Sequence, residues 1–180
     1  MTSIFEPIMI GNVQVKNRMW GAPMGSSQGD DDGWINQKLI DMYAERAKGG
    51  WGLVTVEATW VRWDGTYFPR LISIGHDKRI MGLSELADAI KENGAMSSIQ
   101  LWHAGVSCSL GTHVMGFQPI SPSGLPANFC GVQSRSLSTG EVEELVECYA
   151  QAGRRAKQAG FDMVELHAAH SYLIHEFISP

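Results

Sequence analysis

Short apolar runs that suit buried strands alternate with amphipathic helical segments along this chain, and this alternation constrains its fold most. Residues 53–58 form a nearly continuous, β-branched apolar run, which is typical of a strand covered on both faces. Residues 98–103 predict the next strand, and residues 163–166 predict a short buried strand that is apolar apart from Glu165. Strands that alternate with helices through short turns favour a parallel sheet with right-handed crossovers.

Three helices are predicted in the segments between these strands. The first has Asn36 as its N-cap and ends at residues 49–50, which are both glycine. The third begins with a capping box formed by Ser138 and Glu141, and it ends at Gly160. The apolar positions of all three recur at helical spacing, and they are Leu39, Tyr43 and Ala47; Leu83, Leu86, Ala87 and Ile90; and Val142, Leu145, Val146, Tyr149, Ala152, Ala156 and Ala159.

The remaining segments predict a hairpin, a first strand and a long loop. Residues 4–16 read as a β-hairpin whose two-residue turn is Gly11 and Asn12, because both residue types tolerate a positive φ. Residues 17–24 predict the first strand of the main sheet, which Pro23 closes because proline has no N–H to donate. Residues 104–136 are rich in Gly, Ser and Pro, and a loop of that length is usually functional or disordered.

The predicted order is therefore a hairpin, three strand–loop–helix units and a fourth strand. Four parallel strands can belong to an open doubly wound sheet or to half of a closed (β/α)₈ barrel. No G-x-G-x-x-G follows any predicted strand, which weakens the dinucleotide-binding alternative. The hairpin resembles a plug for the bottom of a barrel, which favours the α/β barrel.

The charge, the cysteine spacing and the hydropathy of the chain argue against several classes of function. The net charge is −5 and the Lys and Arg residues do not cluster, so a nucleic-acid partner is not expected. The three cysteines, Cys108, Cys130 and Cys148, form no C-x-x-C pair, which argues against a disulfide framework or a zinc knuckle. No signal peptide or membrane span is recognisable, so we expect no membrane partner and a cytoplasmic protein.

Two imidazoles and a phenol follow directly after the last predicted strand. His167, His170 and Tyr172 lie within six positions of one another. In a parallel sheet this place is the C-terminal mouth, where α/β enzymes carry their chemistry. Imidazole and phenol groups can hold an anionic or carbonyl oxygen and supply a proton. We therefore expect a catalytic site here.

The sequence resembles the old yellow enzyme family of NADH:flavin oxidoreductases. More narrowly, it is similar to the branch that includes 2,4-dienoyl-CoA reductase, enoate reductase and bile-acid-inducible oxidoreductases. The resemblance runs from about residue 4 to residue 180 in the family's order and spacing. It is carried by Phe5-Glu6-Pro7-Ile8, Lys16-Asn17-Arg18-Met19, Ala22-Pro23-Met24, Tyr43-Ala44-Glu45-Arg46-Ala47-Lys48-Gly49-Gly50, Gln100-Leu101-Trp102-His103-Ala104-Gly105 and residues 160–180.

This resemblance implies a (β/α)₈ TIM barrel with FMN across its C-terminal mouth. By the family's pattern, His167 and His170 would grip the activating oxygen of the substrate, and Tyr172 would be the proton donor. The implied reaction transfers a hydride from reduced flavin to the β-carbon of an enone or enoyl-CoA thioester, with NAD(P)H as reductant. Pro23, Met24 and Gly25 are expected to contact the cofactor through their backbone. The other residues expected to contact it are Ala58, Gln100 and His167.

The chain departs from the family's pattern in sequence and in length. Ser171 replaces a usual Gly, Val106 follows His-Ala-Gly where Arg is common, and Gly25 stands where some members have Cys or Thr. A TIM barrel needs about 250 residues, so residues 1–180 are expected to be the N-terminal part of a single FMN-binding barrel domain. By the resemblance to longer members, a full-length protein could also carry 4Fe-4S and FAD, for which residues 1–180 contain no module. A homo-oligomer or a missing C-terminal half is expected to complete the barrel.

Two alternatives remain open from the residues alone. The first is a metal-dependent barrel hydrolase with His103, His167 and His170 as ligands, although no third clear ligand accompanies the His-x-x-His pair. The second is a non-catalytic half barrel. Four parallel strands leave two open edges, so such a chain is expected to be oligomeric, poorly soluble or largely inactive by itself.

Overall fold

A computed structural model of the chain describes residues 3–67, 70–108, 116–126 and 132–179. Its main sheet has four strands in the order β3-β4-β5-β8, and every neighbouring pair is parallel. These strands are β3 (Trp20–Gly21), β4 (Leu53–Trp60), β5 (Met96–Trp102) and β8 (Met163–Leu166). The parallel sheet that the strand–helix alternation predicts is confirmed, and the arrangement is that of a partial (β/α)₈ barrel.

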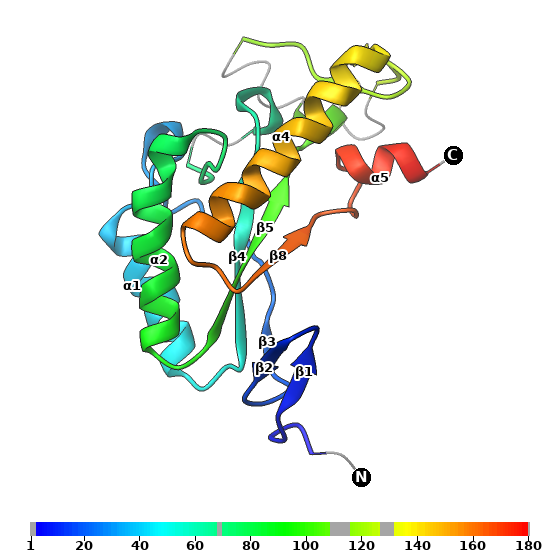
Figure 1. Cartoon of the computed structure of the whole chain (residues 1–180). Coiled ribbons are helices and arrows are strands. Elements are labelled where there is room, and N and C mark those ends of the chain that lie inside the picture. Colours follow the sequence, from blue (N-terminus) through cyan, green and yellow to red (C-terminus); the bar gives the residue numbers. More distant parts are fainter. Residues whose placement is uncertain (1–2, 68–69, 109–115, 127–131, 180) are drawn as a thin grey trace.

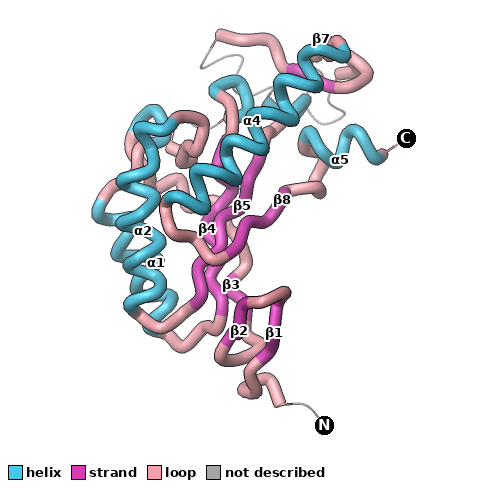
Figure 2. Tube along the Cα trace, in the orientation of Figure 1, coloured by secondary structure: helices cyan, strands magenta, loops and turns pink. Residues whose placement is uncertain are grey.

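Three long helices lie along the sheet, and Figures 1 and 2 show them beside the strands. They are α1 (Gln37–Lys48), α2 (Ile80–Glu92) and α4 (Thr139–Gln158). Their predicted ends are confirmed: Asn36 Oδ1 accepts the N–H of Leu39, and Ser138 and Glu141 form a reciprocal capping box. Each cap satisfies backbone N–H groups that have no partner within the helix.

The main core fills the space between these helices and one face of the sheet. It is built from the predicted stripes of α1 and α2, the C-terminal part of the predicted α4 stripe, and alternate residues of β4 and β5, which point to the same face. The N-terminal part of the α4 stripe lies outside this core: Leu145 packs in a separate small cluster, and Val146 is 64% exposed. Ala152 and Ala156 give α4 a narrow apolar stripe that lets it approach β5 closely. Fully buried members include Leu39, Tyr43, Val56, Leu83, Leu86, Ile90 and Ile99.

A smaller apolar cluster lies on the opposite face of the sheet. Trp102, Leu71, Ala104 and Cys108 form its buried centre. Partly buried residues pack against it, and they are Ala58, Trp60, Tyr67, Phe117 and Tyr172. This face is the one that would line the interior of a barrel, because the helices cover the other.

The predicted N-terminal hairpin is also confirmed. Strands β1 (Ile8–Ile10) and β2 (Val13–Val15) pair antiparallel, and Gly11 in their turn has φ +58°. In Figure 1 the hairpin lies beyond the N-terminal ends of β4 and β5, away from the C-terminal edge of the sheet. Val15 is buried there, and Asn17 Nδ2 donates to the carbonyl of Gly50.

Two details of the sequence prediction were wrong. The first strand is not eight residues long, since only Trp20 and Gly21 pair with β4. Strand β8 forms as predicted but is not buried, because Val164 is 48% exposed and Leu166 is 56% exposed. The reason is that β8 is an edge strand among the described residues, so no neighbour covers these side chains.

The long loop carries short elements that the sequence did not predict. Residues 105–108 form a 3-10 turn, and Ile120–Ser121 (β6) pairs with Arg135–Ser136 (β7). A short helix, α5 (Leu173–Ile178), follows β8, and three other 3-10 turns cover Asp31–Gly33, Trp63–Gly65 and Asp77–Arg79.

Cys108 and Cys148 are free thiols, and Cys130 lies outside the described residues. Within the described part of the chain, no helix has the length and hydropathy to cross a bilayer.

Gly52 and Gly153 give a matched test of this packing. A Cβ on Gly52 would lie 2.5 Å from Asn17 Oδ1 and 2.6 Å from Asn17 O, whereas a Cβ on Gly153 meets nothing within 4 Å. We expect Gly52→Ala to lower the free energy of unfolding by about 1–3 kcal/mol through overpacking. Gly153→Ala is expected to raise it by about 0.5–1 kcal/mol, because alanine favours the helix. Urea unfolding measures both, and equal effects of the two substitutions would contradict this packing.

Candidate active site

A cavity of about 260 Å³ opens at the C-terminal ends of the four parallel strands. Residues at or just after the C-terminal ends of β3, β4, β5 and β8 contribute to its wall, because parallel strands end at the same edge of a sheet. Its floor is partly the apolar cluster around Trp102. The lining residues are Pro23, Gly25, Ser27, Ala58, Tyr67, Leu71, Gln100, Trp102, His167, His170 and Tyr172.

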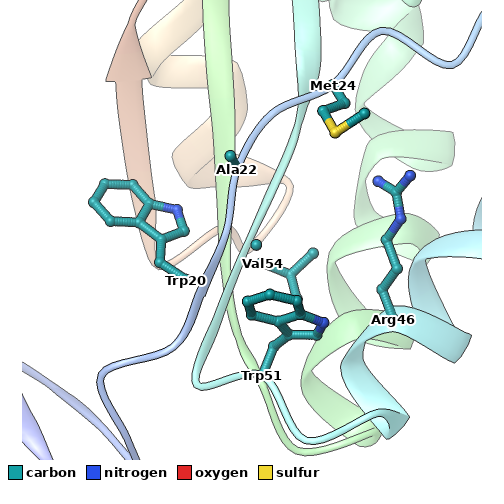
Figure 3. A pocket seen from close by; sticks show the side chains of 7 residues that line it. Trp20, Ala22, Met24, Arg46, Trp51 and Val54 are labelled. Carbon is teal, nitrogen blue, oxygen red and sulfur yellow. The ribbon is translucent and has the colours of Figure 1, made fainter. Parts of the chain in front are cut away.

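All of the sequence-predicted site residues line this cavity except Met24. The side chain of Met24 is 66% exposed and lines another cavity, of about 370 Å³, beside β3. Figure 3 shows Met24 and Arg46 on the same side of the chain there, with Trp51 nearby. Met24 can therefore reach the first cavity only through its backbone.

A β-bulge turns Ala58 toward the cavity. Val56 pairs with Ile99, but the next pair is Thr59 with Leu101, so β4 has one residue more than β5 at this point. Regular alternation would point Ala58 toward the helices, as it does Val56. The bulge reverses this direction and places a methyl group, with little bulk, in the cavity wall.

Glu57 lies within the bulge, is fully buried and supports the loop before the cavity. Its Oε2 accepts the N–H of Ser26 at 2.8 Å, and Ser26 is flanked by the lining residues Gly25 and Ser27. Burial raises the pKa of Glu57 above its ordinary value. The loop is therefore held to the end of β4 by a buried carboxyl group.

Gln100 is oriented by its neighbour on β8. Gln100 and Glu165 are partners in the β5–β8 register, and Gln100 Nε2 donates to Glu165 Oε1 at 2.5 Å. Gln100 is 6% exposed, so this contact fixes the direction of the amide. Because the amide nitrogen points to Glu165, the amide oxygen is left to accept a hydrogen bond from a group in the cavity.

His167 and His170 form an edge-to-face pair with ring centroids 5.2 Å apart. His167 Nδ1 accepts the N–H of Ala169 at 3.4 Å, which places the proton of a neutral ring on Nε2. His167 Nε2 is 3.5 Å from His170 Nδ1, so His170 can offer its own Nε2–H to the cavity. Burial, with His170 close by, lowers the pKa of His167 to about 4, and the ring is therefore neutral at pH 7.

The chain turns sharply between His167 and Tyr172. His170 has φ +57° and Ser171 has φ +56°, both in the left-handed region that costs a non-glycine residue about 1–2 kcal/mol. Glycine would avoid this cost at position 171. Ser171 adopts this conformation nevertheless. The turn places the Tyr172 ring against His167, with centroids 4.7 Å apart.

Three hydrogen bonds tie the Tyr172 segment to the end of β5. The N–H of Leu173 donates to the carbonyl of His103 at 3.1 Å. Ser107 Oγ donates to the carbonyl of Ser171, and the N–H of Val106 donates to Glu176 Oε1 at 2.8 Å. Burial raises the pKa of Glu176 to about 7. Val106 thus contacts Glu176 through its backbone N–H, at the position where the family's pattern commonly has an arginine.

Sequence reasoning missed several cavity residues, chiefly Tyr67 and Trp102. Trp102 is two residues after Gln100, so the period of a strand already places both on one face. Tyr67 had no comparable signal, because it follows β4 in an irregular segment. Its position beside Tyr172 depends on contacts across 105 residues of chain.

The metal-site hypothesis is not supported by these positions. His103 is 1% exposed, its Nδ1 accepts the N–H of Gly105, and its Nε2 lies 3.3 Å from Asp64 Oδ1. Both ring nitrogens are thus engaged away from His167 and His170. In the described part of the chain, no group of three or more His, Cys, Asp or Glu residues is arranged to hold a metal ion.

The pKa of His167 predicts a pH dependence of stability. Between pH 6.5 and pH 4 the unfolded chain binds a proton at this histidine while the folded chain does not. The free energy of unfolding should therefore fall as the pH is lowered through this window. We expect His167→Asn to lose less stability over that range than the parent chain, as measured by urea unfolding at each pH. His76→Asn, in an exposed loop, controls for loss of an imidazole, and identical pH profiles for His167→Asn and the parent would refute the prediction.

Comparisons with known proteins agree on one family. The sequence profile described as NADH:flavin oxidoreductase / NADH oxidase family matches residues 3–180. An NADH oxidase of Thermoanaerobacter brockii is 39% identical over 179 residues, which are 99% of this chain and 27% of that protein. An NADPH dehydrogenase of Bacillus cytotoxicus is 39% identical over 181 residues, which are 99% of this chain and 51% of that protein.

A solved structure gives the same result for the fold. The old yellow enzyme homologue from Zymomonas mobilis superposes with a TM-score of 0.87 and 34% sequence identity. The alignment covers 98% of this chain and 51% of that one. The chain thus spans about half, or less, of the length of these relatives. It belongs to the NADH:flavin oxidoreductase family, the old yellow enzyme family, whose members use FMN and NAD(P)H.

Proposed function

We propose that this chain carries the substrate-activating half of an FMN-dependent ene-reductase site. The reaction would reduce the carbon–carbon double bond of a small enone or enoyl thioester, with NAD(P)H as the reductant. One observation supports this most: Gln100, the His167–His170 pair and Tyr172 line a single cavity at the C-terminal ends of the strands. An amide, two imidazoles and a phenol there have the donor and acceptor types that such a reaction needs.

The cavity wall suits the ring system of FMN. Pro23, Gly25 and Ala58 offer low, flat surfaces, and the free oxygen of Gln100 suits a ring N–H. Reduced FMN, when bound, would supply the hydride. The lining residues include no Lys or Arg, so contacts to the phosphate group would come from elsewhere. A volume of about 260 Å³ is also slightly below the usual range of ligand pockets, about 300–1,000 Å³.

The two histidines would activate the substrate. A carbonyl oxygen that accepts N–H bonds from His167 and His170 draws electrons from the conjugated double bond and makes its β-carbon electrophilic. Neutral rings can do this, because each retains one N–H donor. To serve the oxygen together, the His167 Nε2–H would have to turn from His170 Nδ1, 3.5 Å away, toward the substrate.

Tyr172 would complete the reaction as general acid. Addition of a hydride to the β-carbon leaves an enolate, which needs a proton at its α-carbon. The Tyr172 hydroxyl lies on the cavity wall beside the two histidines and carries a phenolic proton, and its segment is tied to the residues after β5 by the three hydrogen bonds described above.

We further propose that residues 1–180 are the N-terminal part of one FMN-binding barrel domain. The two edge strands, β3 and β8, carry exposed apolar residues: Trp20 is 50% exposed and Leu166 is 56% exposed. Apolar strand edges of this kind call for a covering partner. A second copy of the chain or the second half of the barrel would provide it.

Flavin binding tests the proposed cofactor. The purified protein should take up FMN, turn yellow, and lose its absorbance near 450 nm on anaerobic addition of NADH or NADPH, as roughly expected for a flavoprotein. Gln100→Leu should weaken FMN binding about tenfold, the effect of one lost hydrogen bond. Gln151→Leu, on the exposed side of α4, is the matched control. A colourless protein that cannot be reconstituted with FMN would argue against the proposal.

Tyr172→Phe tests the proton donor. Alkene reduction should slow by about 10²–10⁴-fold, the usual contribution of a general acid. Flavin reduction by NAD(P)H should be unchanged, because that step needs no proton from Tyr172. Tyr149→Phe is the control, since the Tyr149 hydroxyl is buried without a partner among the described residues. Equal alkene-reduction rates in Tyr172→Phe and Tyr149→Phe would exclude Tyr172 as the donor.

A further inference from the structure

Two phenols from distant parts of the chain meet at the cavity wall. Tyr67 Oη and Tyr172 Oη are 2.9 Å apart, which is hydrogen-bond distance, and their rings stack at 25° with centroids 6.5 Å apart. Tyr67 follows the 3-10 turn after β4, whereas Tyr172 follows β8. The sequence alone indicates a site residue at Tyr172 and not at Tyr67.

The surroundings hold both rings in place. Trp102, which is 1% exposed, packs edge-on against Tyr67 at 5.5 Å and against Tyr172 at 5.1 Å. These three side chains belong to the same apolar cluster on the inner face of the sheet. Such edge-to-face contacts favour one arrangement of the rings. The hydrogen bond between the hydroxyls is therefore part of a packed cluster and not a chance contact of two mobile surface groups.

The direction of this hydrogen bond decides which proton can reach a substrate. If Tyr172 donates to Tyr67, its single proton is already used and cannot point into the cavity. If Tyr67 donates to Tyr172, the Tyr172 proton is free. Any tyrosine keeps its proton at neutral pH, and burial together with Tyr172 raises the pKa of Tyr67 further, so Tyr67 has a proton to donate.

We propose that Tyr67 is a positioning residue for proton transfer, and that its hydroxyl donates to the Tyr172 oxygen. This inference rests on the proposed role of Tyr172. In the transfer, the Tyr172 O–H bond breaks and a C–H bond forms at the α-carbon, using the electron pair of the enolate. The negative charge moves to the Tyr172 oxygen, where the Tyr67 O–H stabilises it until water returns the proton.

Tyrosine NMR tests the contact without any flavin. The chain has four tyrosines, so carbon-13 labelling at Cζ gives four signals, and the signal absent from Tyr172→Phe identifies Tyr172. Tyr67→Phe keeps the ring and removes only the hydroxyl, and we expect it to shift the Tyr172 signal. Tyr149→Phe removes a hydroxyl that has no partner among the described residues and should leave the signal in place. An unmoved Tyr172 signal in Tyr67→Phe would overturn the proposal.

Kinetics of the flavin-loaded protein test the consequence. Tyr67→Phe should slow alkene reduction about tenfold, as expected for one lost hydrogen bond to a developing charge. The KM for the alkene and the rate of flavin reduction by NAD(P)H should not change, whereas a general structural defect would alter both. A shifted NMR signal with unchanged alkene reduction would overturn the role in proton transfer. Failure of Tyr172→Phe to slow the reaction would instead overturn the proposed function, so the two failures are distinguishable.

Discussion

The parallel pairing of β3, β4, β5 and β8 is the constraint on which the site depends. Parallel strands end at one edge, so residues far apart in sequence arrive at the same cavity. The helices bury the other face in the main core, and the side chains at the strand ends are thereby directed inward. Local features of the sheet then determine the direction of individual side chains. The bulge in β4 turns Ala58 toward the cavity, and the side chain of Glu165 orients the amide of Gln100.

The segment from His167 to Tyr172 combines local strain with long-range support. Two consecutive residues with positive φ are unfavourable for non-glycine side chains. Hydrogen bonds from Leu173, Ser107 and Val106 to partners across the cavity wall offset this cost, at about 0.5–1.5 kcal/mol each. The aromatic cluster around Trp102 adds packing from a third direction. The positions of the His167 ring and the Tyr172 hydroxyl are therefore properties of the folded sheet and not of the short segment itself.

Local sequence signals predicted the elements well, and they failed where burial depends on a neighbour. The caps at Asn36 and Ser138 and the hairpin turn at Gly11 were predicted correctly, because each depends on contacts within a few residues. The apolar character of Val164 and Leu166 predicts burial, but the exposure of an edge strand depends on what pairs with it.

The sequence by itself determined the alternation of strands and helices, the helix ends, and the placement of His167, His170 and Tyr172 after a strand. These follow from hydrophobic period and capping chemistry, which act over short distances. Only the tertiary structure decided that Tyr67 reaches Tyr172, that Glu165 holds Gln100, and that His103 turns away from the other histidines. Such contacts depend on strand register and on the bulge in β4. No local sequence pattern determines which distant side chain will lie within hydrogen-bond distance of another.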